Sequence, residues 1–475
     1  IDDGRLGQKT KAGFYKKTEE GILSVDLKTG EYKDQKKVLF DGYRVAKAFQ
    51  KVESRIKALA FNDDKAGKFM WEITADSLIY SANRIPEISD DIINIDNAMK
   101  WGYGWELGPF ECWDAMGVQA TVNRMKKENK KVPNWVEEML SSGRETFYEL
   151  KNGKRTYYDV LTSSIKTIEE DPKVINLNLK KSGNNLIKRD WSASLIDLGD
   201  QVLNIEFHSA LQPTLNPIDS SMGEMMNDAM DLLDSDKYKA LVIGHQGANF
   251  CAGANLANMI QVIDANKFDK INNDLKQFQG LMQRIRFSKA PVVAAPHHLA
   301  LGGGFEISAP AVHRVALGEL YMGAVEIGVG LVPGAGGNLR IILNLMENSG
   351  SGRLNAFQVS QKAFETIAFA KVSRSADEAK SLGYLLKTDT VILNNDQRIK
   401  AAKDKALSLI EVGYKPPTYR DDLKLPGTGG RTAIAMVVKG FKAQGKISEH
   451  DEFIAKKLAY ILTGGDKAGL TKSVD

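Results

Sequence analysis

The feature that most constrains the fold is a change of hydrophobic period near residue 195. Between residues 41 and 150, apolar residues recur at three- and four-residue spacing, which is typical of amphipathic helices. Examples are Val45, Phe49 and Val52, and again Phe69, Ile73, Leu78 and Ile79. After residue 195, short apolar runs at 202–207, 240–244 and 291–295 alternate with helical patterns, one that Asp219 can cap and one at 268–285. Strands that alternate with helices predict a sheet with crossover helices. The chain is therefore predicted to be multidomain, with an all-α domain followed by an α/β domain.

The length supports this division, because 475 residues exceed the roughly 100–200 residues of one domain. We expect five segments: 1–40, a tail with a hairpin or linker; 41–150, a helical domain; 151–190, a polar connecting region; 191–350, an α/β core; and 351–475, a mostly helical, basic segment. The chain starts at Ile1 rather than Met and opens inside a motif. We therefore expect it to be an internal fragment of a longer polypeptide.

The composition argues against several classes of function. The 64 Lys and Arg residues nearly balance the 60 Asp and Glu residues, and the densest basic run, 126–131, contains a glutamate, so no nucleic-acid partner is expected. No apolar run approaches the ~18 residues of a membrane span, and no signal peptide is visible. Cys112 and Cys251 lie far apart, which predicts no disulfide framework or metal site and fits a reducing compartment, the cytoplasm.

Three glycine-rich segments carry the chemical information: 249–256, 298–306 and 324–337. The first has small residues after a buried strand pattern, so its backbone can approach a ligand closely. The second contains a triple glycine followed by an apolar helix that we expect from Phe305 to about Val312. The free N–H groups at the start of such a helix favour negative charge.

Glu306 and Glu326 lie in the second and third of these apolar segments. Burial of a carboxylate is costly unless the group is satisfied, and it raises the pKa. Two such groups, 20 residues apart, suit general acid–base work on one substrate. The alternative is structural: the glutamates cap helix ends or pair with Arg314 and Arg340. The residue pattern alone leaves both interpretations open.

The other candidates are weaker. His297 and His298 are candidate bases, but a polar turn is the favoured interpretation, and Cys251 is interpreted as a small core residue rather than a nucleophile. The run 440–447 nearly matches a P-loop but lacks the Ser or Thr after its lysine and follows a helical pattern, so we interpret it as a chance match. No strand–GxGxxG–helix unit occurs, so the chain is not expected to bind NAD by itself.

The three glycine-rich segments, in their order and separation over about 150 residues, resemble the signature blocks of the enoyl-CoA hydratase (crotonase) family. Residues 370–383 resemble the helical segment that follows the core in that family. The resemblance implies the α/β crotonase fold, a ClpP/crotonase-like spiral with C-terminal helices. It also implies a CoA thioester as substrate.

The resemblance also implies roles by position. The backbone N–H groups of Ala254 and Gly303 match the family's two oxyanion-hole donors. Glu306 and Glu326 match its catalytic glutamates, which hold and activate a water molecule, with the main acid–base role on Glu326. Asn255 stands where the family commonly has Asp, at a position that orients the loop. The residues implied to bind acyl-CoA are Ala252, Gly253, Ala254, Leu256, Gly302 and Gly303.

The N-terminal part resembles a second family. Residues 4–15 look like the tail of the C-terminal helical domain of 3-hydroxyacyl-CoA dehydrogenases, and 95–99, 102–104 and 107–111 look like its second, tandem copy. This domain followed by a crotonase domain is the order of one type of bifunctional fatty-acid β-oxidation enzyme. The resemblance implies a dehydrogenase activity, with NAD as cofactor, only in a longer parent whose NAD-binding domain precedes Ile1. It also implies homo-oligomers and a thiolase partner.

Hydration of 2-enoyl-CoA to 3-hydroxyacyl-CoA is the activity that the sequence favours, since both glutamates are present. Two alternatives stay open. One keeps the fold and changes the reaction to double-bond isomerisation or 3-hydroxyacyl epimerisation. The other is a non-catalytic module that binds acyl-CoA or serves assembly.

Overall fold

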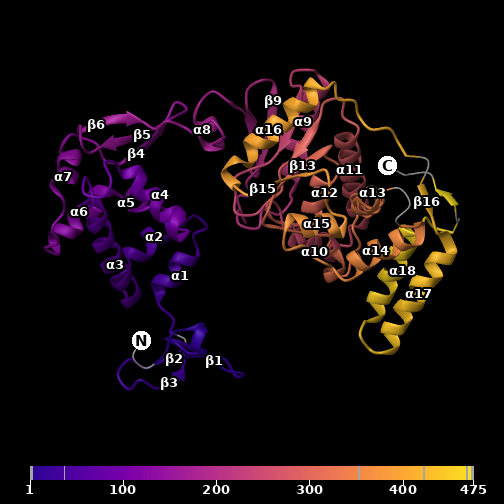
Figure 1. Cartoon of the computed structure of the whole chain (residues 1–475), viewed down its shortest axis with the longest axis horizontal. Coiled ribbons are helices and arrows are strands. Elements are labelled where there is room, and N and C mark those ends of the chain that lie inside the picture. Colours follow the sequence, from indigo (N-terminus) through magenta and orange to yellow (C-terminus); the bar gives the residue numbers. More distant parts are fainter. Residues whose placement is uncertain (1–3, 37, 351–353, 421–422, 467–468, 472–475) are drawn as a thin grey trace. The chain divides into compact units, whose positions relative to one another are not determined.

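The computed structural model describes residues 4–36, 38–350, 354–420, 423–466 and 469–471. The chain divides into two compact units (Figure 1). The first contains the chain up to residue 148 together with 158–165, and the second contains 149–157 and the chain from 166 onward. Within the described residues, no helix is both long enough and apolar enough to cross a membrane.

The first unit begins with a small antiparallel sheet in the order β1 (Tyr15–Lys17), β2 (Ile22–Val25), β3 (Tyr32–Asp34). A short 3-10 helix, η1 (Gln8–Thr10), precedes it. The hairpin predicted within 18–40 is confirmed, because β2 pairs with β3 around a turn in which the Gly30 N–H donates to the Asp26 carbonyl at 2.7 Å.

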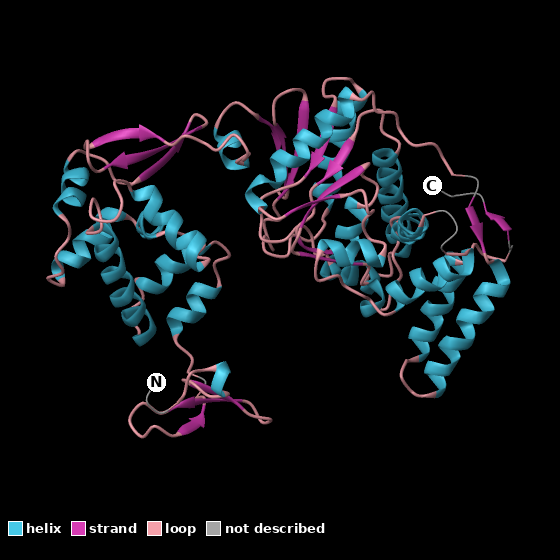
Figure 2. Cartoon of the chain, viewed as in Figure 1, coloured by secondary structure: helices cyan, strands magenta, loops and turns pink. Residues whose placement is uncertain are grey.

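Helices make up most of this unit, as predicted (Figure 2). They are α1 (Asp41–Lys47), α2 (Val52–Ala60), α3 (Lys65–Ala82), α4 (Ile92–Tyr103), α5 (Pro109–Met116), α6 (Val118–Lys127) and α7 (Asn134–Ser141). The buried Asp96 of α4 accepts hydrogen bonds from the N–H groups of Phe110 and Glu111, at 2.8 and 3.2 Å. This carboxylate therefore fastens α4 to the start of α5. The rings of Phe110 and Trp113 pack on Phe147, with centroids 5.1 and 5.3 Å apart.

The apolar face predicted for α3 is only partly right. Phe69 and Ile73 are 67% and 49% exposed, whereas Leu78 is buried as predicted, together with Trp71. The reason is a glycine: a Cβ on Gly67 would lie 2.0 Å from the Asn62 carbonyl oxygen, so the stripe that contains Gly67 packs closely on the preceding turn. The spacing of apolar residues predicts a helix, but the position of a small residue decides which side of that helix packs closely on its neighbour.

The second unit is built on a seven-stranded sheet in the order β15-β13-β11-β10-β9-β8-β7. The strands are β7 (Leu186–Arg189), β8 (Ala193–Asp197), β9 (Val202–Phe207), β10 (Ala240–Ile243), β11 (Val292–Ala294), β13 (His313–Leu317) and β15 (Thr390–Ile392). The five strands from β9 to β15 pair in parallel, and β8 and β7 are antiparallel additions. The strands predicted at 202–207, 240–244 and 291–295 are confirmed, and β7 and β15 extend the sheet beyond 191–350.

Both faces of the central strands of this sheet are buried. Leu241 and Ile243 point into one core, which α9 (Ser220–Asp234) and α11 (Phe268–Arg286) cover. Ala240 and Val242 point into the other, which α16 (Arg398–Glu411) covers. Parallel strands buried on both faces have near-continuous apolar sequences, which explains the run at 240–244. The helix predicted after Asp219 is confirmed as α9, and the Asp219 carboxylate caps it by accepting from the Met222 N–H at 3.0 Å.

Two short parallel strands, β12 (His298–Leu301) and β14 (Leu320–Gly323), form a separate sheet that leads into the glycine-rich turns. The helix after the triple glycine, α12 (Gly303–Ser308), is shorter than the predicted 305–312. It ends early because the chain must join the main sheet, and the Val312 N–H already donates to the Val292 carbonyl.

The remaining elements complete the chain. They are β4 (Tyr148–Lys151), β5 (Lys154–Asp159), β6 (Ser164–Thr167), α8 (Leu177–Ser182), α10 (Leu256–Asp264), η2 (Glu326–Val329), α13 (Gly337–Ser349), α14 (Ala356–Ala368), α15 (Ala376–Leu382), η3 (Asn395–Gln397), β16 (Leu423–Leu425), α17 (Gly427–Ala443), α18 (Glu449–Leu462) and β17 (Gly469–Thr471). The predicted helical character of 351–475 is confirmed in the described part, although β15 and α16 belong to the core. Helices α17 and α18 lie side by side as a hairpin (Figure 1).

Candidate active site

The first two glycine-rich segments lie against each other. The Cys251 N–H donates to the Leu299 carbonyl at 2.9 Å, and the Leu301 N–H donates to the Cys251 carbonyl at 2.9 Å. The segment around Cys251 is therefore fastened to β12, which leads directly into Gly302. The contact requires a glycine at 304, because a Cβ there would lie 2.2 Å from the Cys251 carbonyl oxygen.

This packing brings together the backbone N–H groups of Ala254 and Gly303. A Cβ on Gly303 would lie 3.7 Å from the Ala254 nitrogen, and a Cβ on Gly253 would lie 3.5 Å from the Gly303 nitrogen. Among the described residues, no backbone carbonyl accepts from either N–H. Ala254 is exposed and Gly303 is half-buried. Two adjacent donors that a ligand can reach suit a developing oxyanion.

Glu306 is 4% exposed, and backbone groups at the start of α13 hold its carboxylate. Its Oε1 accepts from the N–H groups of Ala335 and Gly337 at 2.8 and 2.9 Å. Burial raises its pKa to about 6, against the opposing effect of these N–H donors. The structural alternative is therefore partly right, since Glu306 caps a helix. Arg314 is not its partner, because this guanidinium pairs with Asp389 at 2.6 Å.

Glu326 opens the 3-10 turn η2, and its carboxyl lies against the triple-glycine turn. A Cβ on Gly302 would lie 3.1 Å from Glu326 Oε1, so a larger residue there would crowd this side chain. The Oε2 atom is buried and, among the described residues, has no hydrogen-bond partner. Burial raises the pKa of Glu326 to about 8, and the charge of Glu306 adds to the rise. The two carboxyl groups are thus close enough to interact electrostatically.

An unpartnered carboxyl oxygen in a buried position is costly, which suggests that a ligand or a water molecule completes it. The arrangement combines two free N–H donors with two carboxyl groups whose pKa values lie on either side of neutrality. Such a site can polarise a carbonyl group and move protons next to it.

The other candidates from the sequence occupy different places. Ala252 and Gly253 lie in the same loop as Ala254, and Leu256 is 42% exposed at the start of α10. His297 is buried, with Nε2 at 2.8 Å from the Gly247 carbonyl oxygen. The buried Cys251 thiol is free, and burial raises its pKa to about 12, which suits a core residue.

Sequence reasoning missed Tyr384. Its hydroxyl donates to the Lys371 carbonyl at 2.6 Å and accepts from the Ala324 N–H at 3.3 Å, so it braces the segment just before Glu326. Its ring packs edge-on against Phe305 with centroids 5.0 Å apart. No local pattern around Tyr384 indicates this contact, because the partners are distant in sequence.

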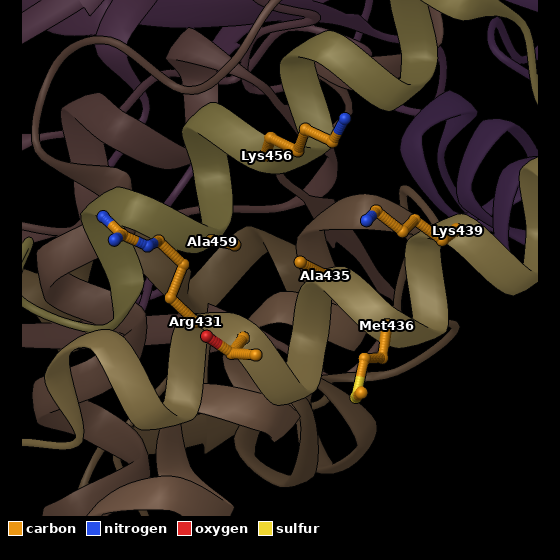
Figure 3. A pocket seen from close by; sticks show the side chains of 7 residues that line it. Arg431, Ala435, Met436, Lys439, Lys456 and Ala459 are labelled. Atoms are coloured by element: carbon orange, nitrogen blue, oxygen red, sulfur yellow. The ribbon is translucent and has the colours of Figure 1, made fainter.

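A separate cavity of about 360 Å³ lies between α17 and α18, and none of its lining residues belongs to the glycine-rich segments. Figure 3 shows Arg431, Lys439 and Lys456 around it. Two of these cations are paired, Arg431 with Asp466 at 2.5 Å and Lys456 with Glu452 at 2.5 Å. The P-loop-like run at 440–447 begins inside α17, in line with a chance match.

Comparison with known proteins places the glycine-rich segments in a family. Residues 211–352 match the family model described as enoyl-CoA hydratase/isomerase. This part of the chain is therefore a crotonase-type domain, as the resemblance of the three segments implied.

Similarity to curated proteins extends into the helical unit. A "Probable 3-hydroxyacyl-CoA dehydrogenase" of Bacillus subtilis is 42% identical over 465 residues, which cover 98% of this chain and 57% of that protein. A "Putative fatty acid oxidation complex trifunctional enzyme" of Rickettsia felis is 27% identical, over 71% of this chain and 42% of that protein. The chain thus spans about half the length of these relatives.

Solved structures are also similar. An enoyl-CoA hydratase from Bacillus anthracis covers 57% of this chain and 90% of its own length at 21% identity, with a TM-score of 0.37. An enoyl-CoA hydratase from Thermoplasma volcanium covers 57% of this chain at 23% identity, with a TM-score of 0.36.

Proposed function

We propose that this chain carries the enoyl-CoA hydratase part of a fatty-acid β-oxidation enzyme and adds water to 2-enoyl-CoA to give 3-hydroxyacyl-CoA. The observation that carries the proposal is the meeting of two free N–H groups with the buried carboxyl group of Glu306 and the half-buried one of Glu326 in one small region. The match of residues 211–352 to the enoyl-CoA hydratase/isomerase family supports it. The Rickettsia felis relative, whose name includes the words "fatty acid oxidation complex", also supports it.

The N–H groups of Ala254 and Gly303 would receive the thioester carbonyl oxygen. Addition of water to the β-carbon moves negative charge onto that oxygen as the enolate forms. Two donors placed for this charge stabilise the transition state more than the substrate, by roughly 3 kcal/mol for each donor. The other loop residues proposed to contact the acyl-CoA are Ala252, Gly253, Leu256 and Gly302.

The lower pKa of Glu306 and the higher pKa of Glu326 assign the roles of general base and general acid to these residues. Glu306, with a pKa of about 6, is mostly ionised at pH 7 and would take a proton from the attacking water. Glu326, with a pKa of about 8, is mostly protonated and would give its proton to the α-carbon. The water oxygen bonds to the β-carbon. A proton then passes from Glu306 to Glu326, which restores the starting state.

The longer protein is proposed to be an NAD-dependent 3-hydroxyacyl-CoA dehydrogenase as well, as the Bacillus subtilis relative's name suggests. This chain contributes only a helical domain of that type, and its sequence has no glycine-rich turn with dinucleotide spacing. No step of the hydration is therefore routed through NAD. Homo-oligomers, a thiolase partner and a cytoplasmic location belong to the same proposal.

The test is hydration of crotonyl-CoA, followed by loss of the enoyl-thioester absorbance. The purified chain should be active, and Glu306→Gln and Glu326→Gln should each lower kcat by roughly 10²–10⁴-fold. A wild-type rate no higher than that of Glu326→Gln would sink the hydratase proposal.

Two other functions predict different results. An isomerase or epimerase would interconvert 2-enoyl and 3-enoyl or the 3-hydroxyacyl epimers, which product analysis detects. One proton-shuttling carboxyl group is enough for isomerisation, so the presence of a second carboxyl group in the site favours hydration. A non-catalytic module would bind acyl-CoA in calorimetry without turnover.

A further inference from the structure

We propose, on the basis of the proposed hydratase function, that His245 and Asn216 are positioning residues for the oxyanion donor Ala254. Their side chains converge on the carbonyl oxygen of Phe250 and hold the segment 250–254, which ends in Ala254. Neither side chain takes part in the proposed hydration mechanism, and both are about 1% exposed.

The surroundings of His245 decide its tautomer. The Gly247 N–H lies 3.1 Å from Nδ1, and a backbone N–H can only donate, so Nδ1 is the acceptor and carries no proton. The hydrogen must be on Nε2, which lies 2.8 Å from the Phe250 carbonyl oxygen and donates to it. Burial lowers the pKa of His245 to about 3, so the ring stays neutral. The ring also stacks on Phe250, with an interplanar angle of 15°.

The same reasoning orients the amide of Asn216. The Ser209 N–H donates to Asn216 Oδ1 at 2.8 Å, which leaves Nδ2 as the donor. Nδ2 lies 3.1 Å from the Phe250 carbonyl oxygen and 3.4 Å from that of Phe207. Two donors from different parts of the chain therefore meet on the Phe250 carbonyl. The 3.2 Å approach of Asn216 Nδ2 to His245 Nε2 is then a contact between two donors and not a hydrogen bond.

The segment from Phe250 to Ala254 runs between two supports and forms an isolated β-bridge with each of them. On one side is β12, which continues into Gly303. On the other side is the segment that carries Asn216: the Ala252 N–H donates to the Leu215 carbonyl at 2.9 Å, and the Ile218 N–H donates to the Gly253 carbonyl at 2.8 Å. The side chains of His245 and Asn216 both bind the Phe250 carbonyl, where the segment 250–254 begins. Its position therefore sets where the Ala254 N–H stands relative to the Gly303 N–H.

The buried guanidinium of Arg398 fixes the backbone of His245. Arg398, at the start of α16, donates from Nη2 to the His245 carbonyl at 2.7 Å and from Nη1 to the Ala295 carbonyl. These carbonyls follow β10 and β11, so the arginine ties together the ends of two parallel strands. His245 consequently has a fixed backbone as well as a fixed ring.

The matched variants are His245→Asn and His245→Gln. An asparagine places its amide near Nδ1 and keeps an acceptor for Gly247, but it has no donor that reaches Phe250. A glutamine places its amide near Nε2 and keeps the donor to Phe250. The control is His313→Asn, because His313 is also buried and bonds Thr390 at the far side of the sheet.

Two readouts separate positioning from stability: the split between kcat and KM with crotonyl-CoA, and the red shift of bound 4-dimethylaminocinnamoyl-CoA, which reports how strongly its carbonyl is polarised. We expect His245→Asn to lower kcat by about 10–100-fold with KM within about 3-fold, and to reduce the red shift. His245→Gln should recover most of both. His313→Asn should lower Tm while leaving kcat and the red shift at wild-type values.

A full red shift in His245→Asn, with kcat equal to that of His313→Asn, would overturn the positioning role. So would an equal loss of kcat in His245→Gln and His245→Asn, since only one of them lacks the donor. If His245→Asn does not fold, Asn216→Asp, which replaces the Nδ2 donor by an oxygen, is judged by the same two readouts. A wild-type chain that does not hydrate crotonyl-CoA refutes the proposed function itself, a result that the variants cannot produce.

Discussion

Gly304→Ala tests whether the contact between the first two glycine-rich segments builds the site. The new Cβ would lie 2.2 Å from the Cys251 carbonyl oxygen and 2.9 Å from the Cys251 Cβ. An ordinary contact needs at least 3.4 Å, so one segment must move by about 1 Å. Because the first atom is backbone, rotation of a side chain cannot relieve the clash. Such overpacking costs about 1–3 kcal/mol of unfolding free energy.

The same movement should lower activity, because Cys251 is in the segment that carries Ala254. A displacement of 1 Å in a catalytic arrangement can cost about 10²-fold in rate. We therefore expect kcat for crotonyl-CoA hydration to fall by about that factor, together with a drop in Tm measured by thermal unfolding.

Gly280→Ala is the matched control, since Gly280 lies inside α11 and a Cβ there meets nothing within 4 Å. It should raise the unfolding free energy by about 0.5–1 kcal/mol and leave kcat unchanged. If Gly304→Ala keeps the wild-type Tm and kcat, the reasoning from this contact is wrong.

Three further predictions follow from the structure. The activity should be bell-shaped in pH, with limbs near pH 6 and 8, because Glu306 must be ionised and Glu326 protonated; a flat kcat/KM profile from pH 5 to 9 would contradict this assignment. Ile260 is 56% exposed on α10, an apolar helix with no buried residue that follows directly after Ala254, so we expect a long acyl chain to contact it. Ile260→Asp should therefore reduce kcat/KM for long-chain enoyl-CoA more than for crotonyl-CoA; equal losses for both substrates would count against it. Arg314→Gln should lower the unfolding free energy by about 3–5 kcal/mol in denaturant titration, since it leaves the buried Asp389 carboxylate without its ion pair; a loss below about 1 kcal/mol would not fit.

The two carboxyl groups also link stability to pH. Both folded-state pKa values, about 6 and about 8, lie above the ordinary 4.5 of a glutamate. The folded chain therefore holds protons that the unfolded chain releases, and the contribution of Glu306 and Glu326 to the free energy of unfolding should fall as the pH rises from about 4.5 to 8. In Glu306→Gln/Glu326→Gln this fall should shrink, which denaturant titrations at several pH values would measure.

The sequence was sufficient for features that depend on local pattern. The period of apolar residues indicated the helices of the first unit and the strands at 202–207, 240–244 and 291–295, because backbone geometry sets those periods. The glycine-rich segments indicated a crotonase-type domain, which the match of residues 211–352 confirms. The prediction failed for Phe69 and Ile73 on α3, which are exposed, and for the end of α12, because close packing at Gly67 and the entry into β13 decided these features.

Only the tertiary structure decided what Glu306 and Glu326 contact. The sequence left open whether they were catalytic or structural. The fold placed Glu306 on the N–H groups of Ala335 and Gly337, and it placed Glu326 against Gly302 with an oxygen unpartnered among the described residues. It likewise brought His245 onto the Phe250 carbonyl. Hydrogen bonds and pKa values depend on which groups meet and how deeply they are buried. These tertiary contacts join residues far apart along the chain, so no local sequence pattern specifies them.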